Sequence, residues 1–234
     1  MTRAVFLDAG HTLLYAHPDL GTIYTQVTAA FGVDLPPARF AAVFGPVFKV
    51  AVQEYASQAH ASDEQDYAMW RAITGRIHAG LPELADVDFE AWFQALYHRF
   101  GESSAWSVYD DVVPVLRRLR ERGLILGVVS NWDSRLQAIS DGLGLTELVD
   151  FLVISARAGV RKPDPGIFQQ ALKQAGVTPE EALHVGDVPE EDIDGARRAG
   201  IRGVLIERRA RLPGHPAPAG TPLIRSLHEL EALL

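Results

Sequence analysis

The segment that most constrains the fold is an apolar run near the N-terminus that ends at a single carboxylate. Residues 5–13 read VFLDAGHTL, so the run stops at Asp8 and small and polar residues follow. The run is too short to cross a membrane and is typical of a buried strand in a parallel sheet. Ligands of open α/β sheets bind at the carboxyl ends of strands. We therefore expect Asp8 to lie at a binding site, although an Asp that begins a turn is the simpler alternative.

The chain beyond Tyr109 alternates between short apolar runs and amphipathic segments. This pattern predicts a parallel sheet with helices on both faces and right-handed crossovers. The expected strands are 3–8, 124–129, 151–154, 183–185 and 203–206. The expected helices are 110–122, 134–143, 165–175, a short one from Thr178, 190–199 and 223–234, with a loop at 212–220.

The segment from Pro18 to about Trp106 has a different pattern, with helical periodicity and no convincing strand. Its aromatic residues are expected to form the core of a helix bundle. Helices are predicted near 19–32, 38–58, 64–79 and 88–100. The chain is therefore predicted to have an α/β core domain, 1–16 with 107–234, and an inserted helical domain, 17–106.

Composition excludes several classes of function. The net charge of −8 argues against a nucleic-acid partner, whose binding surface is normally basic. The chain has no cysteine, which excludes disulfides, thiol catalysis and cysteine-based metal sites. No signal peptide and no 18-residue apolar stretch is visible, so we expect a cytoplasmic protein with no membrane partner. Either a monomer or a homodimer is expected.

Polar residues gather where the predicted strands end. These positions are Asp8 with Thr12, then Ser130-Asn131, then Gly186-Asp187 with Asp192, and Lys162 at the start of a helix between the last two. A carboxylate can attack phosphorus or hold a metal, and hydroxyl and amide groups can hold phosphate oxygens. A lysine neutralises their charge, and Mg²⁺ prefers carboxylates and water. Together these groups suit a phosphoryl substrate.

In this order the motifs resemble the haloacid dehalogenase superfamily, in the phosphatase branch with a helical cap inserted after the first strand. The resemblance covers nearly the whole chain, and the run HVGDVPEEDIDGARRAG, residues 184–200, is its most specific part. It identifies Asp8 as the nucleophile of motif one, followed by Thr12. Ser130 with Asn131 matches motif two, Lys162 of KPDPGIF motif three, and Gly186-Asp187 with Asp192 motif four.

The resemblance implies a Rossmann-like core under a helical cap and a phosphatase reaction through an aspartyl-phosphate on Asp8. It implies Mg²⁺ held by Asp8, the backbone carbonyl of Gly10 and Asp187, with Asp192 supporting those ligands. The substrate would be a small phosphorylated metabolite. Its phosphate would be held by Ser130, Asn131, Thr12 and Lys162, and Lys162 would also serve catalysis.

Motif one departs from the family pattern at Gly10, where a second Asp normally acts as general acid and base. That catalysis is worth roughly 10²–10⁴-fold in rate, so weak activity or a preference for good leaving groups is expected. His11 is a candidate replacement acid because its pKa lies near neutrality, or it is a solvated loop residue. A descendant that binds phosphate and Mg²⁺ without turnover is the alternative.

Two other enzymes of this superfamily also lack the second Asp. A 2-haloacid dehalogenase attacks carbon without a metal, so Asp187 and Asp192 argue against it. A phosphonatase uses a cap lysine as a Schiff base, and Lys49 is the lysine that this segment offers. Desolvation among its aromatic neighbours would lower its pKa, whereas a lysine on a helix surface is the simpler interpretation.

Overall fold

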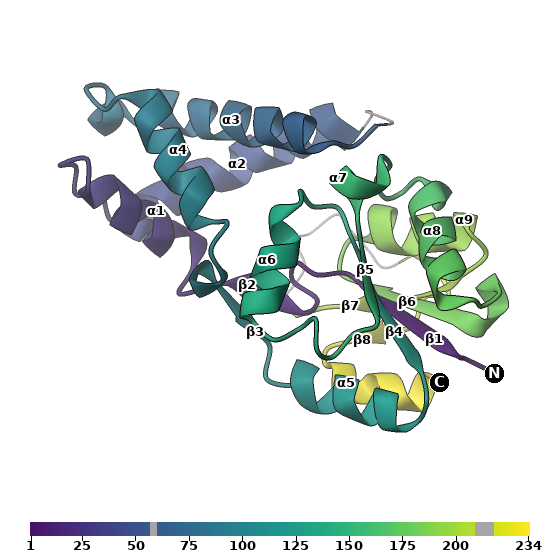
Figure 1. Ribbon diagram of the computed structural model, residues 1–234. Helices are drawn as coiled ribbons and strands as arrows, with labels where there is room; N and C mark the ends of the chain where they lie inside the picture. Colours follow the sequence, from purple (N-terminus) through teal and green to yellow (C-terminus); the bar gives the residue numbers. More distant parts are fainter. Residues whose placement is uncertain (57–59, 209–217) are drawn as a thin grey trace.

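A six-stranded parallel sheet forms the centre of the molecule. The computed structural model describes residues 1–56, 60–208 and 218–234. The strand order is β5-β4-β1-β6-β7-β8, and every neighbouring pair is parallel (Figure 1). The strands are β1 (Ala4–Leu7), β4 (Ile125–Ser130), β5 (Phe151–Ile154), β6 (Ala182–Gly186), β7 (Arg202–Ile206) and β8 (Leu223–Ile224).

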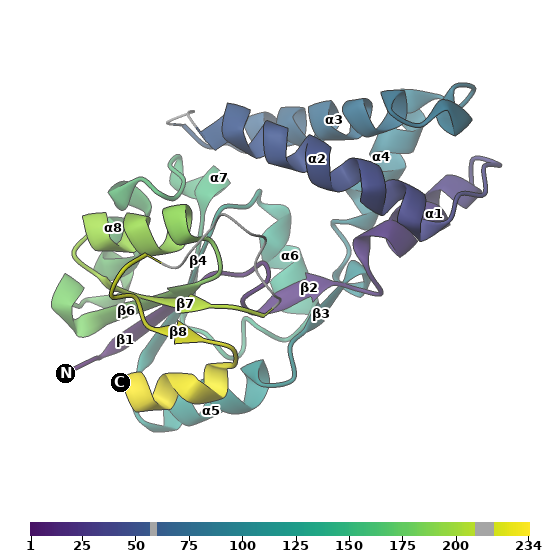
Figure 2. The same cartoon turned by 180° about the vertical axis from the view of Figure 1, so that it is seen from behind.

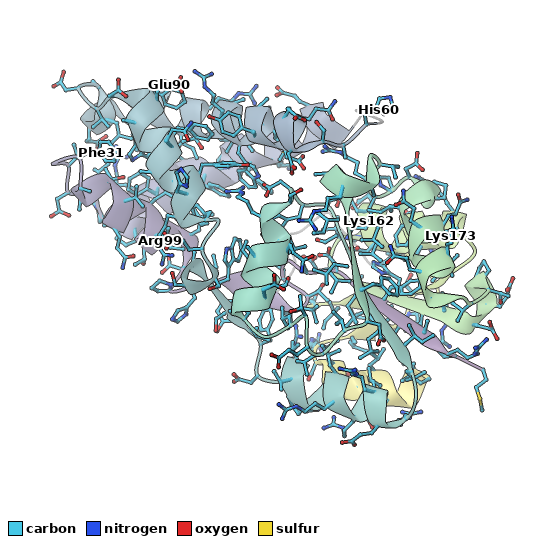
Figure 3. All side chains as sticks on the ribbon, in the orientation of Figure 1. Phe31, His60, Glu90, Arg99, Lys162 and Lys173 are labelled. Atoms are coloured by element: carbon cyan, nitrogen blue, oxygen red, sulfur yellow. The ribbon has the colours of Figure 1, made fainter. Side chains whose placement is uncertain are left out.

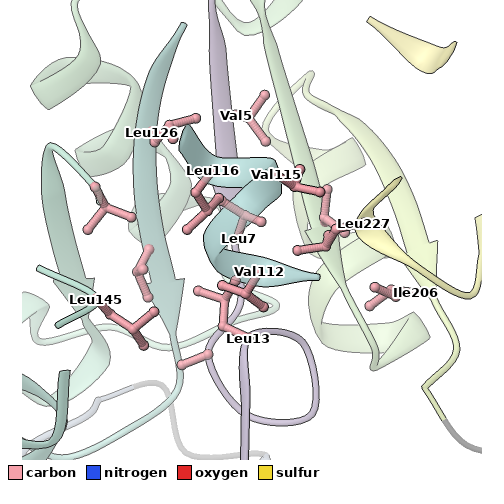
Figure 4. Close-up of a cluster of buried hydrophobic side chains, with 14 of the residues drawn as sticks. Val5, Leu7, Leu13, Val112, Val115, Leu116, Leu126, Leu145, Ile206 and Leu227 are labelled. Atoms are coloured by element: carbon pink, nitrogen blue, oxygen red, sulfur yellow. The ribbon is translucent and has the colours of Figure 1, made fainter. Parts of the chain in front are cut away.

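The sheet is buried on both faces, and β1 sends alternate apolar side chains into a hydrophobic core on each face. Val5 and Leu7 pack into one cluster, and Ala4 and Phe6 into the other. The first cluster holds residues of α5 (Val112–Glu121), α6 (Arg135–Gly142) and the C-terminal 3₁₀ helix η5 (Leu227–Leu233) (Figure 4). The second holds residues of α8 (Pro165–Ala175) and α9 (Gly195–Arg198).

A helical layer interrupts the chain between β1 and β4. A short antiparallel ribbon of β2 (Leu14–Ala16) and β3 (Trp106–Val108) leads out of the sheet domain and back. Between them lie α1 (Leu20–Ala29), α2 (Pro37–Ala56), α3 (Asp63–Ala79) and α4 (Phe89–Arg99). These helices share a third apolar cluster that includes Tyr24, Phe40 and Trp92. The two opposite views show them above the carboxyl edge of the sheet (Figures 1 and 2).

The predicted fold class is confirmed, whereas several predicted elements differ. The expected C-terminal helix 223–234 is wrong, because Leu223 and Ile224 extend the sheet before η5 begins. The expected helix 190–199 is divided into a π-helical turn η4 (Pro189–Asp194) and the short α9. The ribbon β2–β3 and the short helix α7 (Ser155–Ala158) were not predicted. Of the predicted loop 212–220, residues 212–217 lie outside the described part.

Across the described ranges, no helix is long and apolar enough to cross a membrane.

Candidate active site

Asp8 follows β1 at the carboxyl edge of the sheet, between the ends of β4 and β6. Its amide donates to the carbonyl oxygen of Val185 at 2.9 Å, which continues the pairing of β1 with β6 by one residue. Leu7 pairs with Val128 on the other side. The side chain of Asp8 is buried, so the carboxylate sits in a site of low dielectric where nearby charges act strongly.

Lys162 places its ammonium between two of the predicted carboxylates. Nζ donates to Oδ1 of Asp8 at 2.7 Å and to Oδ1 of Asp192 at 2.6 Å. Burial alone would lower the pKa of Lys162, but the carboxylates of Asp192, Asp8 and Glu191 outweigh it and hold that pKa well above its usual range. The lysine is therefore charged, and it lies at the edge of the core that faces the helical layer (Figure 3).

The backbone of Lys162 is held by Asn131, directly after β4. The amide of Lys162 donates to Oδ1 of Asn131 at 2.7 Å, and Nδ2 of Asn131 donates to the carbonyl oxygen of Lys162 at 2.9 Å. The same Nδ2 also donates to Oε2 of Glu191 at 2.8 Å. These bonds hold the segment that carries Lys162 and η4 through the Asn131 side chain, and the phosphate-binding role that the family resemblance implied for Asn131 stays a prediction.

Asp192 lies in the π-helical turn η4, and three donors from outside this turn bind its carboxylate. Its Oδ1 accepts from Lys162 and from Nε2 of His184 at 2.9 Å, and its Oδ2 accepts from the amide of Val188 at 2.9 Å. Burial would raise the pKa of Asp192, but Lys162 and His184 outweigh it and hold that pKa well below its usual range. A Cβ on Gly186 would approach Cγ of Asp192 to 2.1 Å, so this arrangement requires glycine there.

The carboxylates of Asp8, Asp187 and Asp192 form one cluster, in which an oxygen of each lies within 4.8 Å of the others. Burial, together with the negative charges of Asp8 and Asp192, raises the pKa of Asp187 well above its ordinary value. Burial also raises the pKa of Glu191 to about 7. The Lys162 ammonium thus faces a surplus of buried and half-buried carboxylates, which fits the oxygen ligands and the charge that Mg²⁺ requires.

The other predicted residues occupy different environments. Ser130 is buried at the end of β4. Thr12 is fully buried, and its hydroxyl has no hydrogen-bond partner within the described residues. His11 is exposed and has a positive φ of 53°. Lys49 is exposed on α2, where water keeps its ammonium solvated.

Gly10 lies against the ring of Trp132. An ideal Cβ at position 10 would contact Cζ3 of Trp132 at 3.4 Å, and the indole of Trp106 packs edge-on against Trp132. Ser155 fixes the backbone of Trp132 by accepting from its amide at 3.0 Å and donating to its carbonyl at 3.1 Å. The ring of Trp132 therefore borders the space that a side chain at position 10 would enter.

Sequence analysis missed two residues that support the cluster. Glu191 was only part of an acidic run, but its bond to Asn131 joins the ends of β4 and β6. His184 is a buried histidine of β6, and its partner is the site residue Asp192. The available signal was a histidine inside an apolar strand that leads directly into an acidic turn.

Comparison with known proteins decides the family. The family model described as haloacid dehalogenase-like hydrolase matches residues 2–200. This protein belongs to the haloacid dehalogenase-like hydrolases. The family resemblance predicted from the motifs is thereby confirmed, and hydrolase is the class of activity that it shows.

Individual relatives of this hydrolase include both vertebrate and bacterial proteins. Haloacid dehalogenase-like hydrolase domain-containing protein 3 of Danio rerio is 33% identical over 99% of this chain and 96% of its own. Phosphoserine phosphatase of Thermus thermophilus is 36% identical over 64% of this chain and 58% of its own. A solved defluorinating L-2-haloacid dehalogenase has a TM-score of 0.77 at 16% identity, covering 100% of this chain and 95% of its own, which shows a common fold.

Proposed function

We propose that this hydrolase is a Mg²⁺-dependent phosphatase that acts on a small phosphorylated metabolite. The observation that carries the proposal is the pairing of Asp8 with Lys162 beside the surplus carboxylates Asp187 and Asp192. A nucleophilic carboxylate, a charged lysine and a hard-cation site are the groups that phosphoryl transfer needs. The relative described as a phosphoserine phosphatase supports the same class.

In the proposed reaction, a carboxylate oxygen of Asp8 attacks phosphorus while the bond to the leaving oxygen breaks. This step forms an aspartyl-phosphate, which water then hydrolyses to free phosphate and the original carboxylate. Lys162 neutralises phosphoryl charge, and Ser130 and Thr12 are the hydroxyl donors for its oxygens. Asp8, Asp187 and the carbonyl of Gly10 would hold Mg²⁺, which supplies additional charge neutralisation when it is bound.

Gly10 restricts the proposed substrates. Because glycine cannot protonate the leaving oxygen, the reaction favours phosphorylated compounds whose leaving group departs as an anion without help. Acyl and aryl phosphates have such leaving groups. The ring of Trp132 beside this position accommodates an apolar leaving group better than a strongly hydrated one.

We also propose that residues 17–106 act as a cap over the core domain, 1–16 with 107–234. The helices α1–α4 lie above the carboxyl edge of the sheet, where Asp8 is located (Figures 1 and 2). A cover at this edge excludes water from the aspartyl-phosphate and selects substrates.

The alternative enzyme classes have less support. A metal-free dehalogenase has no use for the surplus carboxylates around Lys162. A phosphonatase requires a desolvated cap lysine, whereas Lys49 is exposed. Gly10 favours one second candidate, a protein that binds Mg²⁺ and phosphate without turnover.

Turnover of acetyl phosphate and p-nitrophenyl phosphate with and without Mg²⁺ tests the proposal. We expect activity that depends on Mg²⁺ and disappears in Asp8→Asn, because the amide is a poor nucleophile. Acid-quenched wild-type protein should carry one phosphoryl group on the peptide that contains Asp8. Lack of turnover across a broad phosphate panel, with Mg²⁺ binding intact, would leave the non-catalytic candidate. Fluoride or chloride release from a 2-haloacid would instead support the dehalogenase.

Binding of the metal is tested without turnover. We expect Mg²⁺ to raise the melting temperature of the wild-type protein, because an ion that binds the folded state stabilises it. Asp187→Asn should lose most of this increase. Asp194→Asn is the matched control, since Asp194 lies in the same acidic turn but is half-exposed and outside the cluster. Equal responses of the two variants would contradict this metal site.

A further inference from the structure

Arg208 reaches from the end of β7 to the loop that follows Asp8. Its Nε and Nη2 donate to the carbonyl oxygen of Thr12 at 3.3 and 2.8 Å. One guanidinium therefore holds one peptide carbonyl through two N–H groups. These two hydrogen bonds constrain the backbone of motif one, although Arg208 belongs to none of the motifs that identified the site.

The guanidinium of Arg208 is fixed by residues that precede α5. Nη1 donates to Oδ2 of Asp111 at 2.6 Å, and Cζ lies 4.2 Å from the centre of the Tyr109 ring. The side chains of Arg208 and Asp111 are 7% and 9% exposed. A paired, stacked and almost fully buried guanidinium has little freedom to leave Thr12.

Asp111 is held in turn by the C-terminal segment. It lies at the N-terminus of α5 but makes no side-chain cap there. Instead, its Oδ2 accepts from Oγ of Ser226 at 2.6 Å and from the amide of Leu227 at 2.8 Å. Burial would raise the pKa of Asp111, but the bonds from Arg208, Ser226 and Leu227 outweigh it and lower that pKa, so the carboxylate stays charged.

Within the described residues, backbone bonds also hold the loop that Arg208 contacts, and Lys162 binds the Asp8 side chain at its start. The amides of Leu13 and Leu14 donate to the carbonyl of Ala9 at 2.9 and 3.0 Å, and the amide of Tyr109 donates to the carbonyl of Leu13 at 3.1 Å. None of these bonds reaches the Thr12 carbonyl. Among the described residues, the Thr12 carbonyl receives its hydrogen bonds from Arg208, so this side chain constrains the peptide that follows the buried Thr12 hydroxyl.

We propose that Arg208 is a positioning residue for the loop from Asp8 to Thr12, and that Asp111 holds Arg208 in place. The effect on turnover rests on the proposed phosphatase function, whereas the effect on the loop does not. A displacement of about 1 Å in a reacting group can cost roughly 10²-fold in rate. Loss of the hydrogen bonds from Arg208 to the Thr12 carbonyl should therefore lower kcat more than it changes KM.

The test compares Arg208→Met and Arg208→Lys with Arg118→Met by hydrogen exchange and acetyl phosphate kinetics. Arg118 is the matched control because it bonds Glu231 at 2.6 Å, and so also joins α5 to η5, without contacting motif one. Arg208→Met should exchange faster at residues 9–14 and lose about tenfold to a hundredfold in kcat. Arg118→Met should keep both properties, even where its melting temperature falls.

Arg208→Lys keeps a positive charge beside Asp111 but cannot form the two-pronged bond to Thr12. It therefore decides the matter even if Arg208→Met does not fold. We expect a melting temperature near that of the wild-type protein, with faster exchange at residues 9–14 and a reduced kcat. Unchanged exchange of this loop in a folded Arg208 variant would overturn the proposal. If the wild-type protein hydrolyses no phosphorylated substrate, the phosphatase proposal fails. Hydrogen exchange at residues 9–14 then decides the role of Arg208 by itself.

Discussion

Position 10 has room for the beginning of a side chain. Among the described residues, an ideal Cβ there meets Trp132 alone within 4 Å, at an ordinary van der Waals distance of 3.4 Å. Gly10 is also not among the glycines with positive φ, so an L-residue fits its backbone. The absence of an acid at this position therefore reflects the residue chosen there and not a backbone that demands glycine.

We expect Gly10→Asp to raise phosphatase activity. A carboxylic acid two residues after Asp8 can protonate the leaving oxygen, and this catalysis is worth roughly 10²–10⁴-fold. The gain should be larger for alkyl phosphates than for aryl phosphates, because alkoxides leave less readily. The measurement is kcat/KM for both ester types, with Gly10→Asn as an isosteric control that lacks an acid. An unchanged rate in Gly10→Asp would mean that the missing acid does not limit turnover.

We expect His11→Asn to keep the activity of the wild-type protein within about twofold. The imidazole is exposed and displaced by one residue from the position of the usual acid, so it is poorly placed for proton transfer. Asn is the suitable replacement because it tolerates the positive φ of residue 11. The pH dependence of kcat should also be unchanged. A tenfold loss with a shifted acid limb would instead assign the general acid to His11.

At the scale of elements, α3 joins the helical layer to the core through polar contacts. Oδ1 and Oδ2 of Asp63 accept from the amide and hydroxyl of Ser134, both at 2.7 Å. Nη2 of Arg161 donates to Oδ1 of Asp66 at 3.0 Å. Arg161 directly precedes Lys162, so this ion pair connects α3 with the segment that carries the site lysine.

The ion pair between Asp66 and Arg161 should make the free energy of unfolding depend on pH. Burial raises the pKa of Asp66. The positive charge of Arg161 lowers this pKa, and the negative charge of Asp133 raises it further. Because the raised pKa belongs to the folded state, the contribution of Asp66 is fully present below its ordinary pKa of 3.8 and declines as the pH rises through the folded value. Asp66→Asn should therefore remove this decline in the free energy of unfolding.

Urea unfolding across the acidic pH range measures that decline. Asp63→Asn provides the control, because Asp63 also joins α3 to the core but is exposed. It should keep the wild-type slope, whereas Asp66→Asn should flatten it. Equal slopes in wild-type protein and Asp66→Asn would show that Asp66 does not titrate differently on folding.

At the scale of the whole molecule, the apolar interior is divided between the sheet and the helical layer. Two clusters lie on opposite faces of the sheet, and a third lies among α1–α4. The described contacts between the helical layer and the sheet domain include ion pairs and hydrogen bonds. Two parts joined by such contacts can unfold separately more readily than two parts that share an apolar core.

We expect Ile77→Ala to loosen the helical layer alone. Ile77 is fully buried in α3, and removing its side chain should cost about 2–5 kcal/mol. Hydrogen exchange should become faster in α1–α4, while β1, β4 and β6 stay protected. Leu116→Ala, at a fully buried position in α5, is the control and should affect the sheet domain. Uniform loss of protection in Ile77→Ala would show that the chain unfolds as a single unit.

The sequence alone determined the parallel sheet and the helical insertion, because hydrophobic periodicity reports which faces are buried. Its motifs also indicated the family that the family model confirmed, because Asp8, Lys162 and Asp187 stand at strand ends and helix starts in a specific order. Periodicity did not determine the C-terminal segment, where β8 forms only because the edge of β7 is available for pairing. It likewise gave no sign of the π-helical turn, which exists because Asp192 turns back over Gly186 to Lys162 and His184.

The tertiary structure alone decided which residues support the predicted site. His184, Glu191 and Arg208 contact site residues or their backbone across strands and loops, and such contacts have no fixed spacing along the chain. The stretch from Val5 to Leu13 illustrates both sources of information. Its residues predicted a strand ending at Asp8 and the missing acid at Gly10. Their surroundings, Lys162 on the carboxylate, Trp132 against Gly10 and Arg208 on Thr12, are set by packing that brings distant segments together.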